Sequence, residues 1–240
     1  MLHGAERGRF ELMFRVPSEC ADLLQNGDAD IGIVPSLELG RQSWDVVPGL
    51  GIACRGPVRS ILLISKRPAS TIRLLAADSS SRTSVALADA ILSRKFGVQA
   101  EIIKHRPDLE SMLQNADAAL IIGDPALRID PAQLPFYTYD LGQEWVEMTG
   151  LPMVFAMWAG RRGCITPAVI ESFMNSWRSG MANLETIVHS ESALRGFPPD
   201  LVRRYLTSHI VHELGVAEER GLKLFLEYTH HTSMRVQEGA

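Results

Sequence analysis

The sequence has few cysteines, no cluster of basic residues and no long apolar run, and each of these shortages excludes a class of protein. Cys20, Cys54 and Cys164 are odd in number and widely spaced, which indicates neither a disulfide framework nor a zinc motif. The formal net charge of −4 argues against a nucleic-acid partner. No apolar stretch approaches the roughly 20 residues that span a membrane, and residues 1–7 lack the apolar core and cleavage site of a signal peptide. We therefore expect a cytoplasmic protein with reduced thiols, and neither a nucleic acid nor a membrane as its partner.

The residues that are present indicate a globular α/β protein. The chain has 240 residues, of which 46% are hydrophobic and 22% charged, and this suffices for one large domain or two small ones. Apolar segments of strand length alternate with helical patterns over the first two-thirds of the chain, and the part after Thr166-Pro167 looks helical almost to its end. Such alternation is typical of mostly parallel sheets flanked by helices. The expected strands are 10–14, 29–34, 60–65, 74–78, 100–103 and 118–122.

One stretch, residues 74–85, joins a buried strand to an amphipathic helix through a polar loop. Val85, Ala88, Leu92 and Phe96 recur at helical spacing after six consecutive polar residues, 79–84. Free backbone N–H groups and the positive end of the helix dipole make such a helix start a natural anion site. Ser and Thr are also ordinary helix caps, but one cap needs only one such residue. We therefore predict a ligand-binding helix start.

Three expected strands end in polar or glycine-rich tips, at 34–36, 77–79 and 122–124. Ligands of open α/β sheets bind beyond the carboxyl ends of strands, so we expect a cleft closed from two sides. Charge and proline at 66–68 suggest a crossing between lobes, and the apolar run 153–158 suggests the return. The predicted division is residues 1–66 with 156–240 as one lobe and 67–155 as the other. The late helices offer packing surface for contacts between lobes or for a homodimer.

Five segments carry a family resemblance: GDADIGIVPSLE at 27–38, RGPVRS at 55–60, SRTS at 81–84, LIIGDPAL at 120–127 and WVEMTGLP at 145–152. Together they resemble one enzyme family, the chorismate dehydratases of the futalosine pathway of menaquinone biosynthesis. The similarity covers nearly the whole chain in order, and the combination is specific although each piece is short. It implies a two-lobed fold like that of type II periplasmic binding proteins, with the ligand between the lobes. It also implies a reaction without a cofactor, in which chorismate loses water to give 3-[(1-carboxyvinyl)oxy]benzoate.

Two comparisons within the resemblance affect the functional prediction. A sister enzyme, which acts on cyclic dehypoxanthine futalosine, carries a histidine where this chain has Gly123, and this favours the dehydratase. The family also opens with a strand that ends in a Tyr-Leu-Asn-like motif, whereas residues 2–8 match the segment just after that motif. We therefore expect the first strand, and with it the catalytic asparagine, to be missing, through truncation or a start codon assigned too late. The alternative function is a non-catalytic cytosolic protein of the same fold that binds a small anion.

A dianionic substrate requires walls rich in hydrogen-bond donors. The expected substrate-binding residues are Thr83 and Ser84 at the helix start, with Ser36, the turn Gly56–Val58 and Ser60 from the other lobe. Neither a metal nor a cofactor is expected, and no His, Lys or Glu in these motifs is an obvious base, so a substrate carboxylate is a candidate for that role. Three further candidates each have an alternative structural role. Asp124 is either a catalytic group or a helix cap, and Arg82 and Arg55 are either substrate ligands or solvent-facing side chains. Gly123 is expected to form part of the binding wall.

Overall fold

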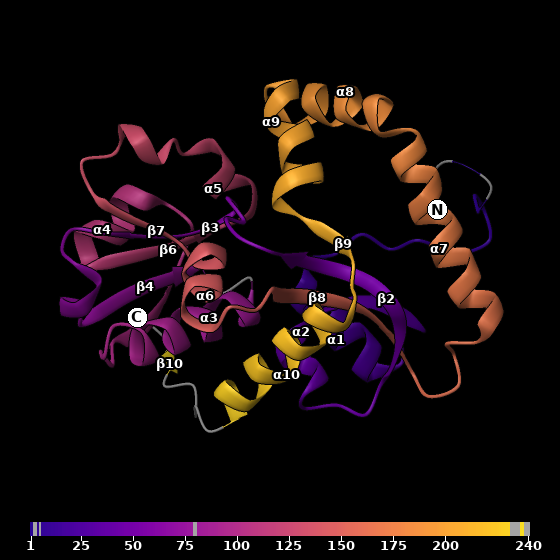
Figure 1. The fold of residues 1–240 in the computed structure, drawn as a ribbon, viewed down its shortest axis with the longest axis horizontal. Coiled ribbons are helices and arrows are strands. Elements are labelled where there is room, and N and C mark those ends of the chain that lie inside the picture. The colour runs from indigo at the N-terminus through magenta and orange to yellow at the C-terminus, as the bar shows by residue number, and fades with distance from the viewer. Residues whose placement is uncertain (2–3, 5, 79–80, 231–235, 238–240) are drawn as a thin grey trace.

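A computed structural model describes residue 1, residue 4 and residues 6–78, 81–230 and 236–237. Its strands form two sheets that lie side by side (Figure 1). The first sheet has the order β1 (Ile31–Pro35), β8 (Met153–Gly160), β2 (Asp45–Cys54), β9 (Val211–Glu213). The second has the order β10 (Val236–Gln237), β5 (Glu101–His105), β4 (Leu74–Asp78), β6 (Ala118–Ile122), β3 (Ile61–Ser65), β7 (Tyr137–Asp140).

The strand directions correct the expectation of mostly parallel sheets. Every pairing in the first sheet is antiparallel. In the second sheet β10, β5, β4 and β6 run parallel, and β3 is antiparallel to both of its neighbours. The α/β class and the flanking helices are as predicted, but the sheets are mixed.

The crossings between the two sheets lie at 55–60 and 150–152, several residues before the expected positions. β3 pairs along its whole length with β6, so it belongs to the second sheet and not to a first lobe ending at residue 66. β8 pairs with β1 and β2 from Met153 onward, so the first sheet resumes before residue 156. A buried strand of five apolar or small residues fits either sheet, and only pairing decides which one it joins.

The helices cover both sheets and form an arch at the edge of the molecule. α7 (Pro167–Ala182), α8 (Leu184–Arg195) and α9 (Pro199–Arg204) make the arch, and the π-helical turn η3 (Tyr205–His209) leads back to β9 (Figure 1). None of the helices in the described part of the chain combines the length and the apolar character needed to cross a membrane. The other helices are α1 (Pro17–Asn26), α2 (Ser36–Leu39), α3 (Arg82–Arg94), α4 (Leu109–Asn115), α5 (Gly123–Arg128), α6 (Leu141–Thr149) and α10 (Val216–His230), with short 3₁₀ turns at Ala69–Thr71 and Pro131–Gln133.

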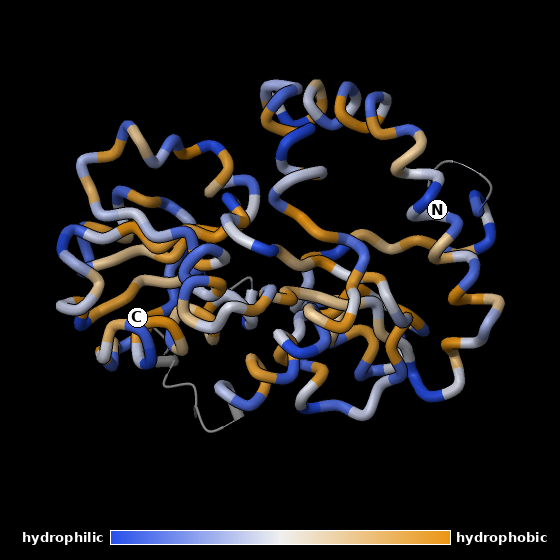
Figure 2. Tube along the Cα trace, in the orientation of Figure 1, coloured by the Kyte–Doolittle hydropathy of each residue, from blue (hydrophilic) through white to orange (hydrophobic). Residues whose placement is uncertain are grey.

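The largest apolar cluster connects the two sheets. It includes Cys54 from β2, Leu63 from β3 and Met153 from β8. In the same cluster the indole of Trp145 on α6 packs edge to face with the ring of Phe225 on α10, with centroids 5.9 Å apart. Figure 2 shows the apolar residues concentrated along the strands. The junction between the sheets is therefore a packed part of the core.

The predicted strand at 10–14 is wrong. Residues 11–16 have no regular structure, and the side chain of Phe14 is 67% exposed. Phe10 packs edge to face against Phe173 of α7, with centroids 5.6 Å apart. Alternating apolar residues form a strand only where another strand pairs with them, and no described strand pairs with this segment.

Candidate functional site

The segment 55–60 carries the chain from β2 to β3 and contains four of the predicted site residues. The backbone N–H groups of Val58 and Arg59 donate to the two carboxylate oxygens of Asp140, at 2.9 and 2.6 Å. Arg59 has a φ of 67°, a left-handed conformation that is uncommon for a residue other than glycine. Its guanidinium donates to the carbonyl oxygens of Ala126 (3.0 Å) and Ile129, at the end of α5. The turn is thus held to the second sheet on two sides.

Ser60 and Gly123 lie side by side at one edge of the second sheet. β3 and β6 are antiparallel with Ile61 opposite Ile122, and the Gly123 N–H donates to the Ser60 carbonyl oxygen at 2.8 Å. Gly123 begins α5 with a φ of 65°, which favours glycine at this position. The Ser60 hydroxyl is buried and accepts a hydrogen bond from the Tyr205 hydroxyl at 3.0 Å.

The predicted helix start is confirmed as the N-terminus of α3. Ser81 caps the helix by accepting from the Ser84 N–H at 3.3 Å, and the hydroxyls of Ser81 and Ser84 lie 2.9 Å apart. Ser79 and Ser80, which belong to the same polar run, lie outside the described residues. Thr83 and Ser84 are 1% and 2% exposed, so the structure buries both predicted donors.

Leu37, which follows the tip at 34–36, contacts this helix start across the junction. The Leu37 N–H donates to Thr83 Oγ1 at 3.3 Å. Ser36, just before it, is fully buried and donates its hydroxyl hydrogen to the Val154 carbonyl oxygen of β8 at 2.7 Å. The residue after one predicted tip is therefore in direct contact with the predicted helix start, and the junction is closed at this point.

Both predicted arginines form ion pairs within the protein. Arg82 contacts Glu38 at 3.1 Å and Asp22 at 3.4 Å, and the hydrogen bond to Glu38 is the main cause that raises the pKa of Arg82. Arg55 contacts Glu218 of α10 at 2.8 Å, and this hydrogen bond raises the pKa of Arg55. Both guanidinium groups remain partly exposed, whereas the side chains of Glu38 and Glu218 are 6% and 1% exposed.

Asp124 is part of an ion pair and not a helix cap. Its carboxylate lies 2.9 Å from Arg195 on α8, whose guanidinium also contacts Glu191 at 2.7 Å. α5 follows Ile122 and has no side-chain cap. The Asp124 side chain is 42% exposed. The pair joins the end of β6 to the helical arch.

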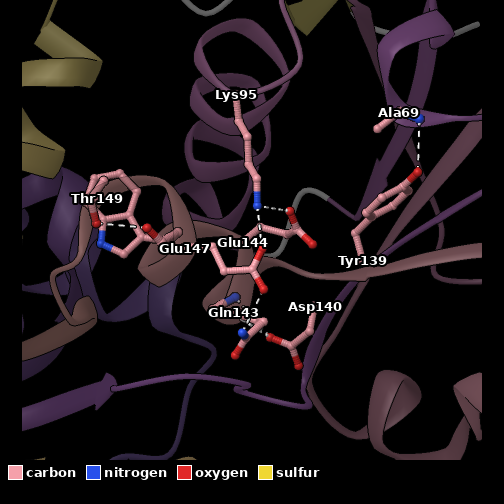
Figure 3. Close-up of polar contacts among 10 residues, drawn as sticks. Ala69, Lys95, Tyr139, Asp140, Gln143, Glu144, Glu147 and Thr149 are labelled. Atoms are coloured by element: carbon pink, nitrogen blue, oxygen red, sulfur yellow. Dashed lines mark hydrogen bonds and ion pairs between the residues drawn. The ribbon is translucent and has the colours of Figure 1, made fainter.

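Polar contacts fix α6 to α3 on the side of the second sheet (Figure 3). Lys95, at the end of α3, donates to Glu144 and Glu147 of α6 at 2.6 and 2.7 Å. Partial burial lowers the pKa of Lys95, but the two carboxylates outweigh this effect and raise it. Asp140 caps α6 by accepting from its first N–H groups. α3 is therefore held at both ends, by Leu37 at its start and by α6 at its end.

Two histidines near the junction, His209 and His212, lie against other parts of the protein. His209 Nδ1 lies 2.9 Å from the Pro57 carbonyl oxygen. Burial lowers the pKa of His212, on β9. Within the described residues no group of three or more His, Cys, Asp or Glu side chains is placed to hold a metal ion.

Two cavities flank the first sheet, and the predicted site residues line neither. A cavity of about 720 Å³ lies between α2, β2 and α10, with Leu37 and Leu222 among its walls. A second cavity of about 870 Å³ lies under α7 and α8 and includes Trp158 and Trp177. The predicted hydroxyls instead make contacts within the protein, Thr83 with Leu37 and Ser60 with Tyr205. The partners Asp140, Tyr205 and Glu218 were missed because each is distant in sequence and carries no motif.

Comparisons with known proteins identify the family to which the chain belongs. Residues 1–231 match the family described as menaquinone biosynthesis. The chain is 30% identical to the chorismate dehydratase of Thermus thermophilus, over 91% of this chain and 86% of that protein. It is 28% identical to the chorismate dehydratase of Campylobacter jejuni, over 88% and 80% of the two chains.

Solved structures with similar folds agree with the architecture. A protein from Archaeoglobus fulgidus has a TM-score of 0.69 at 16% identity, with 91% of this chain and 84% of that chain covered. The periplasmic aliphatic sulphonate binding protein of Escherichia coli has a TM-score of 0.58 at 15% identity, with 89% and 75% covered. These likenesses confirm the predicted periplasmic-binding-protein-like fold, and the sequence matches go further. The chain therefore belongs to the menaquinone biosynthesis family, which includes the chorismate dehydratases.

Proposed function

We propose that this protein is a hydro-lyase that converts chorismate to 3-[(1-carboxyvinyl)oxy]benzoate in menaquinone biosynthesis by the futalosine route. The observation that carries the proposal is the 30% identity to a chorismate dehydratase over 91% of the chain. The family match over residues 1–231 supports the same pathway. Neither comparison favours the alternative of a non-catalytic anion-binding protein.

The reaction needs binding and proton movement more than strong chemical activation. Chorismate is a dianion, and the hydrogen on the ring carbon that carries the ether oxygen is acidified through the conjugated ring carboxylate. Loss of this hydrogen as a proton, together with departure of the ring hydroxyl, releases one water and makes the ring aromatic. Aromatisation supplies the driving force, so the protein has to hold the ring and direct the proton.

The junction between the sheets has the groups that such a substrate requires. Thr83 and Ser84 begin α3, where backbone N–H groups and the helix dipole favour an anion. Ser60 and Gly123 lie beside each other where β3 begins and β6 ends. Substrate entry would separate the Leu37 N–H from Thr83 Oγ1, or add a partner to this hydroxyl. A carboxylate of the substrate would accept the ring proton, because the predicted binding residues include no His, Lys or Glu and the carboxylate of Asp124 is paired with Arg195.

An absorbance assay tests the function directly. Purified protein is mixed with chorismate, and the loss of the diene and appearance of the aromatic product are followed by ultraviolet absorbance and proton NMR. We expect enzyme-dependent release of one water per chorismate with no added metal or cofactor. Chorismate that binds but stays unchanged would contradict the lyase and support the binding protein, and chorismate that neither binds nor changes would exclude both.

A further inference from the structure

Tyr205 occupies an unusual backbone position next to the proposed site. It opens the π-helical turn Tyr205–His209, which follows α9 and leads into β9 (Figure 1). π-Helical turns are rare and concentrate at functional sites, because the wider turn redirects side chains. Here the turn sends two side chains toward the segment 55–60. The Tyr205 hydroxyl reaches Ser60, and the His209 ring reaches the Pro57 carbonyl oxygen.

The direction of the hydrogen bond between Tyr205 and Ser60 has a chemical consequence. The Tyr205 hydroxyl donates to Ser60 Oγ at 3.0 Å, so it occupies one of the two acceptor positions of that oxygen. A serine hydroxyl carries one hydrogen of its own, and in the described part of the chain no acceptor takes the hydrogen of Ser60. A hydroxyl that accepts one hydrogen bond also becomes a better donor in the next, because hydrogen bonds in a chain polarise one another.

The surroundings keep both hydroxyls in place and in the required state. Ser60 is 5% exposed, and its carbonyl oxygen accepts from the Gly123 N–H at 2.8 Å, which fixes its backbone. Burial raises the pKa of Tyr205, so the phenol keeps its hydrogen at neutral pH and remains a donor.

We propose that Tyr205 is a positioning residue for the site: by donating to Ser60 Oγ, it turns the Ser60 hydroxyl hydrogen toward a carboxylate oxygen of the substrate. This inference rests on the proposed function, because it assigns Ser60 a substrate carboxylate as its acceptor. Tyr205 itself does not touch the substrate. The class of ligand that the pair selects is a carboxylate anion, since a neutral hydroxyl on the substrate has less need of a strong donor.

A double-mutant cycle tests this role. Tyr205→Phe removes only the hydroxyl, and Ser60→Ala removes the group that the tyrosine directs. We expect Tyr205→Phe to lower kcat/KM about tenfold, through a higher KM with kcat nearly unchanged, because a bond to a carboxylate is present in both the ground and transition states. Ser60→Ala should cost at least as much, and the double variant should equal Ser60→Ala. Effects that multiply would show independent roles and overturn the proposal, as would an unchanged Tyr205→Phe.

Tyr139→Phe is the matched control. Tyr139 lies on β7 opposite Leu63, and its hydroxyl accepts from the Ala69 N–H at 3.0 Å (Figure 3), so this variant also loses one phenol hydrogen bond. We expect its kcat/KM to match that of the wild type, and a loss equal to that of Tyr205→Phe would make the effect a general one of stability. The dissociation constant of chorismate, measured by calorimetry for all variants, separates the two proposals. If the wild type binds chorismate without converting it, the dehydratase proposal is refuted. The positioning role of Tyr205 is still supported in that case if Tyr205→Phe weakens chorismate binding when Ser60 is present but not in the Ser60→Ala variant. A wild type that does not bind overturns both.

Discussion

Replacement of Thr83 by valine separates the structural from the functional role of this residue. Thr83 is 1% exposed at the start of α3, and its hydroxyl oxygen accepts from the Leu37 N–H at 3.3 Å. Valine has nearly the same shape but no hydroxyl, so the substitution leaves the packing and removes one hydrogen-bonding group. Two losses follow, one from stability and one from substrate binding.

The expected loss of stability is small. A buried N–H without a partner costs about 1–3 kcal/mol, and the long 3.3 Å bond between the Leu37 nitrogen and Thr83 Oγ1 places the cost near the lower end. For a chain of this size, about 1 kcal/mol lowers the melting temperature by roughly 2–4 °C. The loss of a bond to a substrate carboxylate is larger, about 1.5–3 kcal/mol, which lowers kcat/KM roughly 10- to 150-fold.

The assay compares Thr83→Val with Thr83→Ser, which keeps the hydroxyl. We expect Thr83→Ser to retain most of the wild-type kcat/KM for chorismate and Thr83→Val to lose it, while thermal unfolding shows both variants folded. If kcat/KM of Thr83→Val stays within about twofold of the wild type while its melting temperature falls, Thr83 serves only to hold Leu37, and its assignment to the substrate is wrong.

Two further predictions concern groups around the junction. Burial raises the pKa of Glu218, but hydrogen bonds from Arg55 and the Gly215 N–H outweigh this effect, so the pKa is lowered. A carboxylate with a lowered pKa in the folded state contributes stability above the unfolded-state pKa of about 4.3. This stability is lost as the pH falls through the folded-state pKa. Urea unfolding should therefore show Glu218→Gln less stable than the wild type by about 1 kcal/mol at pH 7, with the difference vanishing in acid, and an equal difference at pH 3 would contradict this. Burial also raises the pKa of the Cys54 thiol to about 12, so iodoacetamide at pH 8 should alkylate Cys20 and Cys164 before Cys54, as read by peptide mass spectrometry; early modification of Cys54 would show that the junction opens readily.

Local features of the site follow directly from the sequence. The start of α3 was predicted from a polar run before a helical pattern, and the structure begins the helix at Arg82 with Ser81 as its cap. The strand end at 122–124 was predicted in the same way, and Gly123 has the positive φ that glycine permits. Both features depend on a few neighbouring residues, and such features are readable from a single sequence.

Features that depend on distant residues were not predictable in this way. The apolar pattern of 60–65 identified a strand but assigned it to the wrong sheet, because pairing with β6 is invisible in the strand itself. The ion pairs of Arg55 and Arg82 raise the same difficulty, since Glu218 lies 163 positions from Arg55 and Glu38 lies 44 positions from Arg82. The sequence around such an arginine does not distinguish one that binds a substrate anion from one that forms an ion pair with an acid elsewhere in the chain.

The contacts also reduce the number of predicted donors that remain for a ligand. The single hydrogen of the Val58 N–H is donated to Asp140, and the Ser36 hydroxyl donates its hydrogen to Val154. Thr83 and Ser60 differ, because each acts as acceptor in the hydrogen bond found for its hydroxyl, from Leu37 and from Tyr205. Among the residues that the structure describes, neither hydroxyl donates to another group, so each has its own hydrogen for an anionic oxygen while the protein bond stays intact. Two carboxylates on the substrate and two such hydroxyls, one on α3 and one before β3, make these residues the first to test.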